Sequence, residues 1–101
     1  MLRDLFDELE EKGQQQIVFY GASDLAEIAY ISLQDSGLEL IAIVDDIKAG
    51  RAFIGRQIES PAALADKQFD KILITAVNSR ELLIEKLRDF GIPLEKILVI
   101  Q

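Results

Sequence analysis

The residues with the clearest chemical potential lie in the stretch IVFYGASDLAEIAY, from Ile17 to Tyr30. Gly21, Ser23 and Ala26 follow a loosened form of the pattern G-x-G-x-x-G/A. In that pattern the first glycine makes the tight turn between a strand and a helix, and the third position needs only a small residue. Exposed N–H groups at such a helix start favour an anion. The stretch therefore has the outline of a phosphate-binding turn.

Serine at position 23 leaves two interpretations of this turn open. The second glycine of the pattern lets the backbone approach a pyrophosphate, whereas Ser23 adds a Cβ and a hydroxyl that can hydrogen-bond a phosphate oxygen. Asp24 places a carboxylate at the same positive end of the helix dipole, where it competes with an anion. In the alternative interpretation, Ser23 and Asp24 merely cap the helix.

Asp45 favours the nucleotide interpretation. It ends the next predicted strand, LELIAIVDD, about where an acid accepts hydrogen bonds from an adenosine ribose. Strands also commonly end in Asp at ordinary turns. A glycine turn and an acid at this separation in one strand–helix–strand unit are more specific than either alone. The acid disfavours a 2′-phosphate, so the sequence predicts NAD, or a related nucleotide, rather than NADP.

A third group of polar residues follows a later predicted strand. Ala76, Asn78, Ser79 and Arg80 offer amide, hydroxyl and guanidinium groups at another helix start. These groups either contact a ligand or, in the case of Asn78 and Ser79, cap the helix. The basic residues of the 48–56 loop are more simply explained as solvated loop charges.

The elements that must position these loops alternate between helix and strand. Apolar spacing and stop signals predict helices at 1–13, 24–34, 61–66 and 80–90, strands at 17–20, 38–44, 71–75 and 97–100, and a short edge strand at 57–58. Strands that are apolar on both faces belong to parallel sheets covered by helices on each side. The predicted fold class is α/β, with three layers, a mostly parallel sheet of about five strands and an extra N-terminal helix. We expect one domain over 1–101, with the helix at 1–13 and the α/β core at 16–101.

Composition excludes several classes of function. With 18 acidic and 11 basic residues the net charge is −7, which argues against direct nucleic-acid binding by this domain. The chain has no histidine or cysteine, so the sequence predicts no metal site and no catalytic constellation. We therefore expect a protein that is not an enzyme. No apolar run approaches the roughly 20 residues that cross a bilayer, and no secretory signal is visible, so the expected location is cytoplasmic.

The segment YGASDLAEIAYISLQDSGLELIAIVDD, followed by AGRAFIGRQIESP, resembles the Rossmann-like nucleotide-binding domains that accompany other bacterial domains. It is similar to the domain after a winged helix in some bacterial transcriptional regulators. It is also similar to the domain that precedes the catalytic part of nucleotide-sugar dehydratases and epimerases of polysaccharide synthesis. The resemblance implies Gly21, Ala22, Ser23 and Asp45 as ligand contacts, with Asp46 and the 76–80 loop as further candidates.

The sequence thus predicts a non-catalytic domain that binds a small-molecule nucleotide. In the leading hypothesis it is the sensor domain of a bacterial transcriptional regulator and binds NAD or a related nucleotide. One alternative is a ligand-free dimerisation or scaffold domain that has kept the fold and lost the pocket, forming a homodimer. The other is the N-terminal domain of a nucleotide-sugar dehydratase or epimerase.

Overall fold

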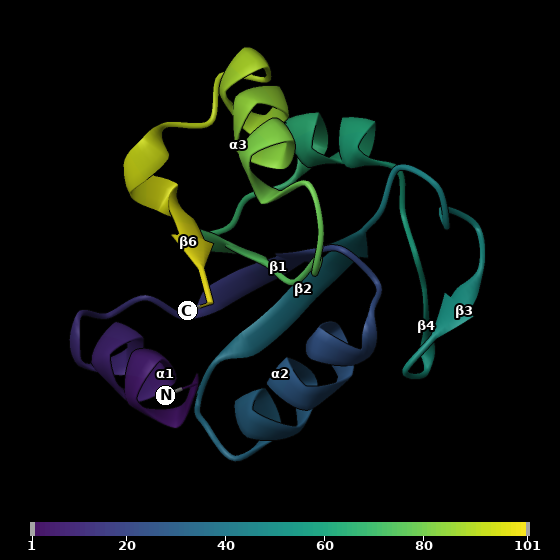
Figure 1. The fold of residues 1–101 in the computed structure, drawn as a ribbon. Coiled ribbons are helices and arrows are strands. Elements are labelled where there is room, and N and C mark those ends of the chain that lie inside the picture. The colour runs from purple at the N-terminus through teal and green to yellow at the C-terminus, as the bar shows by residue number, and fades with distance from the viewer. Residues whose placement is uncertain (1, 101) are drawn as a thin grey trace.

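The computed structural model describes residues 2–100, which form an alternating α/β chain (Figure 1). In chain order the elements are α1 (Leu2–Glu11), β1 (Gln16–Tyr20), α2 (Asp24–Gln34), β2 (Glu39–Val44), β3 (Ala52–Phe53), β4 (Arg56–Gln57), the 3-10 helix η1 (Pro61–Asp66), β5 (Lys71–Ile74), α3 (Arg80–Asp89), the 3-10 helix η2 (Leu94–Lys96) and β6 (Ile97–Val99). None of the helices within 2–100 is long and apolar enough to cross a membrane.

The main sheet has four strands, all parallel, in the order β2-β1-β5-β6. Helices α1 and α2 cover one face, and α3 and η1 cover the other, which gives three layers (Figure 1). Strand β1 lies between β2 and β5 and is buried almost throughout. The α/β class, the layers and the additional N-terminal helix are therefore as predicted.

Alternate side chains of β1 enter two separate hydrophobic cores. Ile17 and Phe19 belong to the core beneath α1 and α2, whereas Val18 and Tyr20 belong to the core beneath α3 and η1. This division follows from the two-residue period of a strand, since successive side chains point to opposite faces. The side chain of Tyr20, at the carboxyl end of β1, consequently faces the α3 side.

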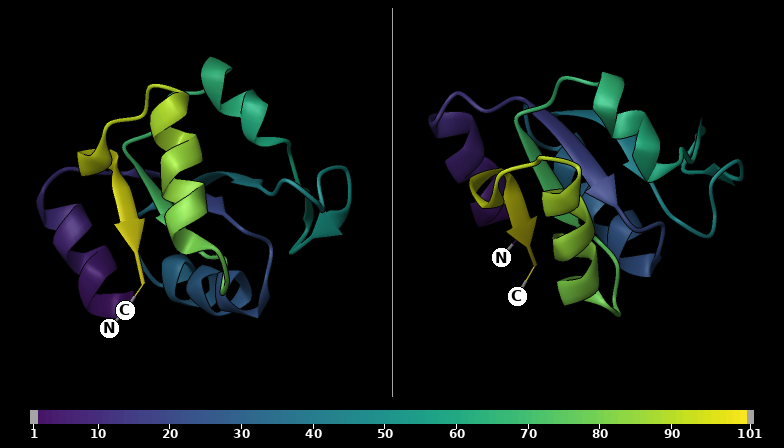
Figure 2. Two further views of the ribbon diagram at one scale, coloured as in Figure 1. Left: turned by 45° about the horizontal axis from the view of Figure 1, so that its top comes forward. Right: turned by 90° about the horizontal axis from the view of Figure 1, so that it is seen from above.

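The predicted sheet of about five strands included a short edge strand at 57–58, and this strand does not join the main sheet. β4 pairs with β3 in a separate antiparallel hairpin, and the chain meets β2 only at an isolated bridge between Val44 and Glu59. Figure 2 shows the hairpin projecting from the end of the molecule opposite α1 and β6. Gly50 and Gly55 have positive φ angles that turn the chain into the hairpin, and Pro61 lacks the N–H needed to continue pairing.

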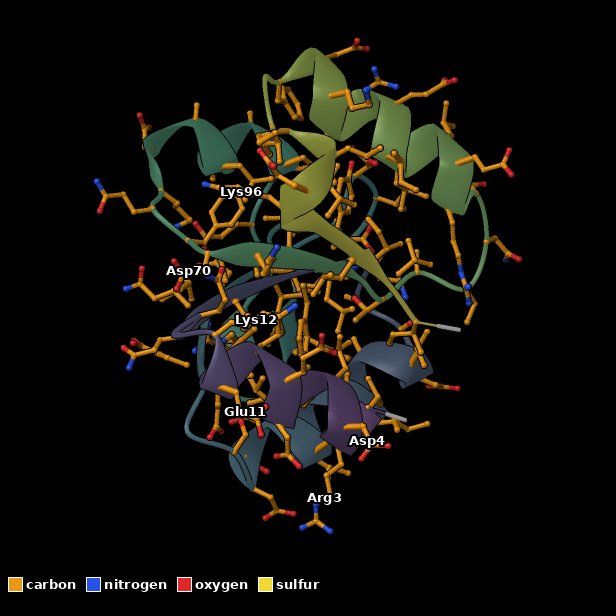
Figure 3. All side chains as sticks on the ribbon, turned by 90° about the vertical axis from the view of Figure 1, so that its left-hand side faces the viewer. Arg3, Asp4, Glu11, Lys12, Asp70 and Lys96 are labelled. Carbon is orange, nitrogen blue, oxygen red and sulfur yellow. The ribbon has the colours of Figure 1, made fainter. Side chains whose placement is uncertain are left out.

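At the amino end of the sheet, one carboxylate sets the position of β1 against β5. Asp70 Oδ2 accepts hydrogen bonds from Gln15 N at 2.7 Å and Gln16 N at 2.9 Å. These two N–H groups, with Lys96 and Lys71 nearby, hold the pKa of the Asp70 carboxyl below its usual value. Asp70 and Lys96 lie near each other at this end in Figure 3. The contact fixes the start of β1 beside β5 and leaves the opposite end of the sheet for the loops discussed next.

Candidate functional site

The three loops that carry the predicted site residues meet at the carboxyl ends of neighbouring strands. Tyr20, the last residue of β1, pairs with Val44 of β2 on one side and with Ile74 of β5 on the other. The loops that follow these three strands therefore begin side by side. In parallel α/β sheets this end of the sheet is where ligands bind.

Two cavities open among these loops, and each of the three loops contributes residues to both. The α3 cavity, of about 360 Å³, is lined by Gly21, Ile47 and Ala76 and by the first turns of α3. The hairpin cavity, of about 460 Å³, is lined by β3 and by the next residue of each loop, which is Ala22, Lys48 or Val77.

Gly21 is required at this turn for two independent reasons. Its φ angle is +119°, which L side chains rarely adopt. A Cβ placed there would lie 2.5 Å from the backbone nitrogen of Ala76 and 2.7 Å from its Cα. The glycine therefore lets the turn after β1 approach the loop after β5 at backbone contact distance.

Thr75 and Ser23 tie the same two loops together. Thr75 is fully buried, and its Oγ1 donates a hydrogen bond to the carbonyl of Gly21 at 2.6 Å. Ser23 Oγ in turn donates to the carbonyl of Thr75 at 2.5 Å. Ser23 occupies the N-cap position of α2, but its side chain makes no capping hydrogen bond. Its hydroxyl instead binds the backbone just after β5, a role that neither interpretation of the sequence included.

Replacing Thr75 with valine is expected to lower the free energy of unfolding by about 1–3 kcal/mol, because the carbonyl of Gly21 loses its buried donor while the shape of the side chain is kept. Thr75→Ser is the matched control, since it retains the hydroxyl and removes only a methyl group. Urea unfolding followed by circular dichroism measures both variants. A smaller loss in Thr75→Val than in Thr75→Ser would show that the hydroxyl does not support the turn.

The turn after β2 holds both polar groups of Ala22, an arrangement that we call the Ala22 clamp. Asp45 Oδ2 accepts a hydrogen bond from Ala22 N at 2.9 Å, and Lys48 Nζ donates to the carbonyl of Ala22 at 2.7 Å. Asp45 Oδ1 also accepts hydrogen bonds from the backbone N–H groups of Ile47 and Lys48. Both oxygens of Asp45 are thus engaged by the protein, and one of the N–H groups expected to face a phosphate is already satisfied.

The surroundings of Asp45 stabilise its charged form. Partial burial, the largest single influence, opposes ionisation, but the three backbone N–H groups and the ammonium of Lys48 together hold the pKa of Asp45 below its usual value. The carboxylate therefore stays ionised at neutral pH. Its role as a ligand contact remains a prediction.

The neighbouring Asp46 lies in a different set of contacts. Its Oδ2 accepts a hydrogen bond from the hydroxyl of Tyr20 at 2.8 Å and forms an ion pair with Lys86 Nζ at 3.3 Å. Burial, followed by the hydrogen bond and charge of Asp46, raises the pKa of Tyr20 far above its usual value, so the hydroxyl stays protonated and donates. All three residues line the α3 cavity.

The remaining predicted site residues are divided between the two cavities or lie outside them. Asn78 lines the α3 cavity and Asp24 lines the hairpin cavity. Ser79 occupies the N-cap position of α3 in a left-handed conformation, φ 61°, without a side-chain capping bond. Arg80 lines neither cavity, and its Nη1 donates to the carbonyl of Ile100 at 2.8 Å. No cluster of acidic side chains within residues 2–100 is arranged to hold a metal ion.

Sequence reasoning included neither Tyr20 nor Lys86 among the candidate site residues. The two-residue period of β1 and its tyrosine end could have suggested a hydroxyl at the carboxyl end of the sheet. Lys86 carries no such signal, because it lies in the middle of α3 and reaches Asp46 only through tertiary packing. Leu82 and Leu83, which also line the α3 cavity, carry no such signal either.

Comparison with known proteins assigns most of the chain to one family. The family model described as C2185-like, N-terminal, matches residues 13–98. The match includes β1, the Gly21 turn, the two aspartates after β2 and the whole of α3. A search of curated proteins found no match.

A solved structure has a similar fold. The crystal structure of UDP-D-quinovosamine 4-dehydrogenase from Vibrio fischeri superposes with a TM-score of 0.69. The aligned region covers 87% of this chain and 79% of that one, at 21% sequence identity. A similarity at this level of identity establishes the Rossmann-like fold and does not transfer an activity.

Proposed function

This chain belongs to the C2185-like N-terminal family, and from that premise we propose that it is a nucleotide-binding domain forming the N-terminal part of a nucleotide-sugar enzyme. The observation that carries the proposal is the pair of cavities on either side of the Gly21 turn, at the carboxyl ends of β1, β2 and β5. Such a position is where parallel α/β sheets bind ligands. We propose binding rather than catalysis for the chain itself, since it contains neither histidine nor cysteine.

We prefer this proposal to the sensor domain of a transcriptional regulator, which the sequence favoured. Neither similarity reported above involves a transcriptional regulator. The similar solved structure is named as a dehydrogenase of a UDP-sugar. The N-terminal domain of a nucleotide-sugar enzyme, an alternative in the sequence analysis, therefore has the better support.

The proposed ligand is a nucleoside diphosphate derivative, either a UDP-sugar or NAD. Both contain a ribose and a diphosphate, so both need hydroxyl acceptors and positive charge in one site. The two cavities supply the carboxylate of Asp46 as an acceptor, and Lys48, Lys86 and Arg51 as cations. Large apolar side chains beside them offer a surface for a base.

A ligand-free scaffold domain is the second candidate function, and the Ala22 clamp favours it. The N–H of Ala22 and the hydroxyl of Ser23 already have protein partners. A turn of this kind offers a phosphate fewer free donors than an open glycine-rich loop does. A scaffold would self-associate and would not respond to nucleotides.

A thermal-shift screen of the full chain tests the proposal. The panel contains UDP-glucose, UDP-N-acetylglucosamine, UDP, NAD+, NADH, ADP and coenzyme A. A ligand at about 100 times its dissociation constant adds roughly 2.7 kcal/mol, which raises the melting temperature of so small a domain by on the order of 10 °C. We expect a shift of this size with a UDP compound or with NAD.

If no compound of the panel at millimolar concentration changes the melting temperature, the binding proposal is overturned. Sedimentation measurements on the same samples then distinguish the second candidate, because a scaffold domain is expected to self-associate without any nucleotide. A shift with coenzyme A alone would retain a nucleoside diphosphate derivative as the ligand and reject both a UDP-sugar and NAD.

A further inference from the structure

Two adjacent carboxylates, Asp45 and Asp46, follow β2, and they have different hydrogen-bond partners. Asp45 accepts three backbone N–H groups and uses both oxygens to do so. A carboxylate in this state has little remaining capacity for the two hydroxyls of a ribose. Recruiting it for a ligand would release Ala22 from the clamp and leave the N–H group without its acceptor.

Asp46, in contrast, keeps one oxygen available. The hydroxyl of Tyr20 and the ammonium of Lys86 both contact Oδ2, and no donor among residues 2–100 contacts Oδ1. The side chain of Asp46 is 36% exposed and lines the α3 cavity. Because Tyr20 is almost completely buried, its hydroxyl holds the carboxylate in a fixed orientation.

The α3 cavity around Asp46 combines this polar end with apolar walls. Ile47 and Leu82 line it and remain exposed, Ile47 by 85% and Leu82 by 52%. Large exposed apolar side chains at the mouth of a cavity often mark a ligand-binding surface. A flat ring joined to a sugar matches this combination, since the ring covers apolar surface and the sugar hydroxyls donate to a carboxylate.

Lys86 makes the site compatible with a charged nucleotide. Asp45 and Asp46 bring two negative charges to the site, and the ammonium of Lys48 lies near that of Asp45. The ammonium of Lys86, 3.3 Å from Asp46 Oδ2, offsets one of these charges and still leaves Oδ1 available as an acceptor.

We infer that the α3 cavity is the nucleoside subsite, in which Asp46 Oδ1 accepts the ribose hydroxyls and the base packs against Ile47 and Leu82. Tyr20 and Lys86 position Asp46. Asp45 is a structural residue of the Ala22 clamp and does not contact the ribose. The inference rests on the proposed nucleotide function and specifies its site.

The test compares UDP with 2′-deoxy-UDP, and ADP with 2′-deoxy-ADP, by isothermal titration calorimetry. For wild type we expect the ribonucleotide that binds to do so at least about tenfold more tightly than its deoxy analogue, because removing the 2′-hydroxyl removes a hydrogen bond to a charged acceptor. In Asp46→Asn we expect this preference to fall to less than about twofold. Asp35→Asn is the matched control: it removes an exposed carboxylate at the end of α2, outside both cavities, and should keep the preference.

The outcomes separate the inference from the proposed function. If wild type binds none of the four nucleotides, and none of the thermal-shift panel, the proposed function fails. If wild type binds but does not discriminate against the deoxy analogue, or if folded Asp46→Asn keeps the discrimination, the function stands and the Asp46 subsite is overturned. The wild-type comparison needs no variant, so it can overturn the subsite even where Asp46→Asn does not fold.

Discussion

Replacing Gly21 with alanine is expected to lower the free energy of unfolding by about 3–5 kcal/mol, a large part of the stability of a domain this small. Two costs add. The φ angle of +119° is unfavourable for alanine, and the new Cβ would lie 2.5 Å from the backbone nitrogen of Ala76. Because the atoms it meets belong to backbone and to a short side chain, no flexible group can move aside.

Gly50→Ala separates these two costs. Gly50 also has a positive φ, +92°, but nothing lies within 4 Å of the position of its Cβ. We expect this control to lose about 1–2 kcal/mol from the backbone conformation alone. Urea unfolding at pH 7, followed by circular dichroism, measures both. Equal losses in the two variants would mean that the loop after β5 yields to the new methyl group.

The second large effect is expected at Asp45. Asp45→Ala should lower the free energy of unfolding by about 2–3 kcal/mol, because three backbone N–H groups lose a charged acceptor and the clamp on Ala22 opens. Asp24→Ala is the control, since it removes an exposed acid that also lines the site. Urea unfolding compares the two variants with wild type, and an Asp45→Ala domain as stable as Asp24→Ala would contradict the structural role assigned to Asp45.

The same carboxylate gives the wild-type protein a specific response to acid. The folded-state pKa of Asp45 lies below its unfolded value, which is about 3.9. The contribution of Asp45 to the free energy of unfolding is therefore complete above that value and is lost as the pH falls through the folded-state pKa. The urea midpoint of wild type should fall more steeply below about pH 4 than that of Asp45→Asn. Parallel curves would show that another carboxylate, such as Asp70, dominates the acid response.

Most of the fold could be predicted because its signals are local. Continuous apolar runs identify β1, β2, β5 and β6, and Ser60 followed by Pro61 marks the start of η1, where the Ser60 side chain does accept from Ala62 N. The short edge strand expected at 57–58 does not join the main sheet, because a hairpin turned by Gly50 and Gly55 pairs β4 with β3. Apolar pattern alone does not reveal that pairing.

The candidate site was predictable in position and not in detail. Topology alone brings the loops after β1, β2 and β5 together, so Gly21, Asp45 and Ala76 were expected near one another. Which carboxylate is free and which is used by the backbone depends on distances between loops far apart in sequence. The sequence pattern points to Asp45, whereas the Ala22 clamp and Lys86 point to Asp46.

The order of strands in the sheet also bears on how the chain folds. β1 can pair with β2 by closing a short connection, and the contact between Ala22 and Asp45 spans 23 residues. The contact between Thr75 and Gly21 spans 54 residues, and pairing over such a separation costs more loop entropy and slows folding. During synthesis the strand–helix–strand unit of β1, α2 and β2 can therefore form first. The α3 cavity exists only once β5 has docked and α3 has followed it, so a chain still emerging from the ribosome gains its nucleoside subsite late.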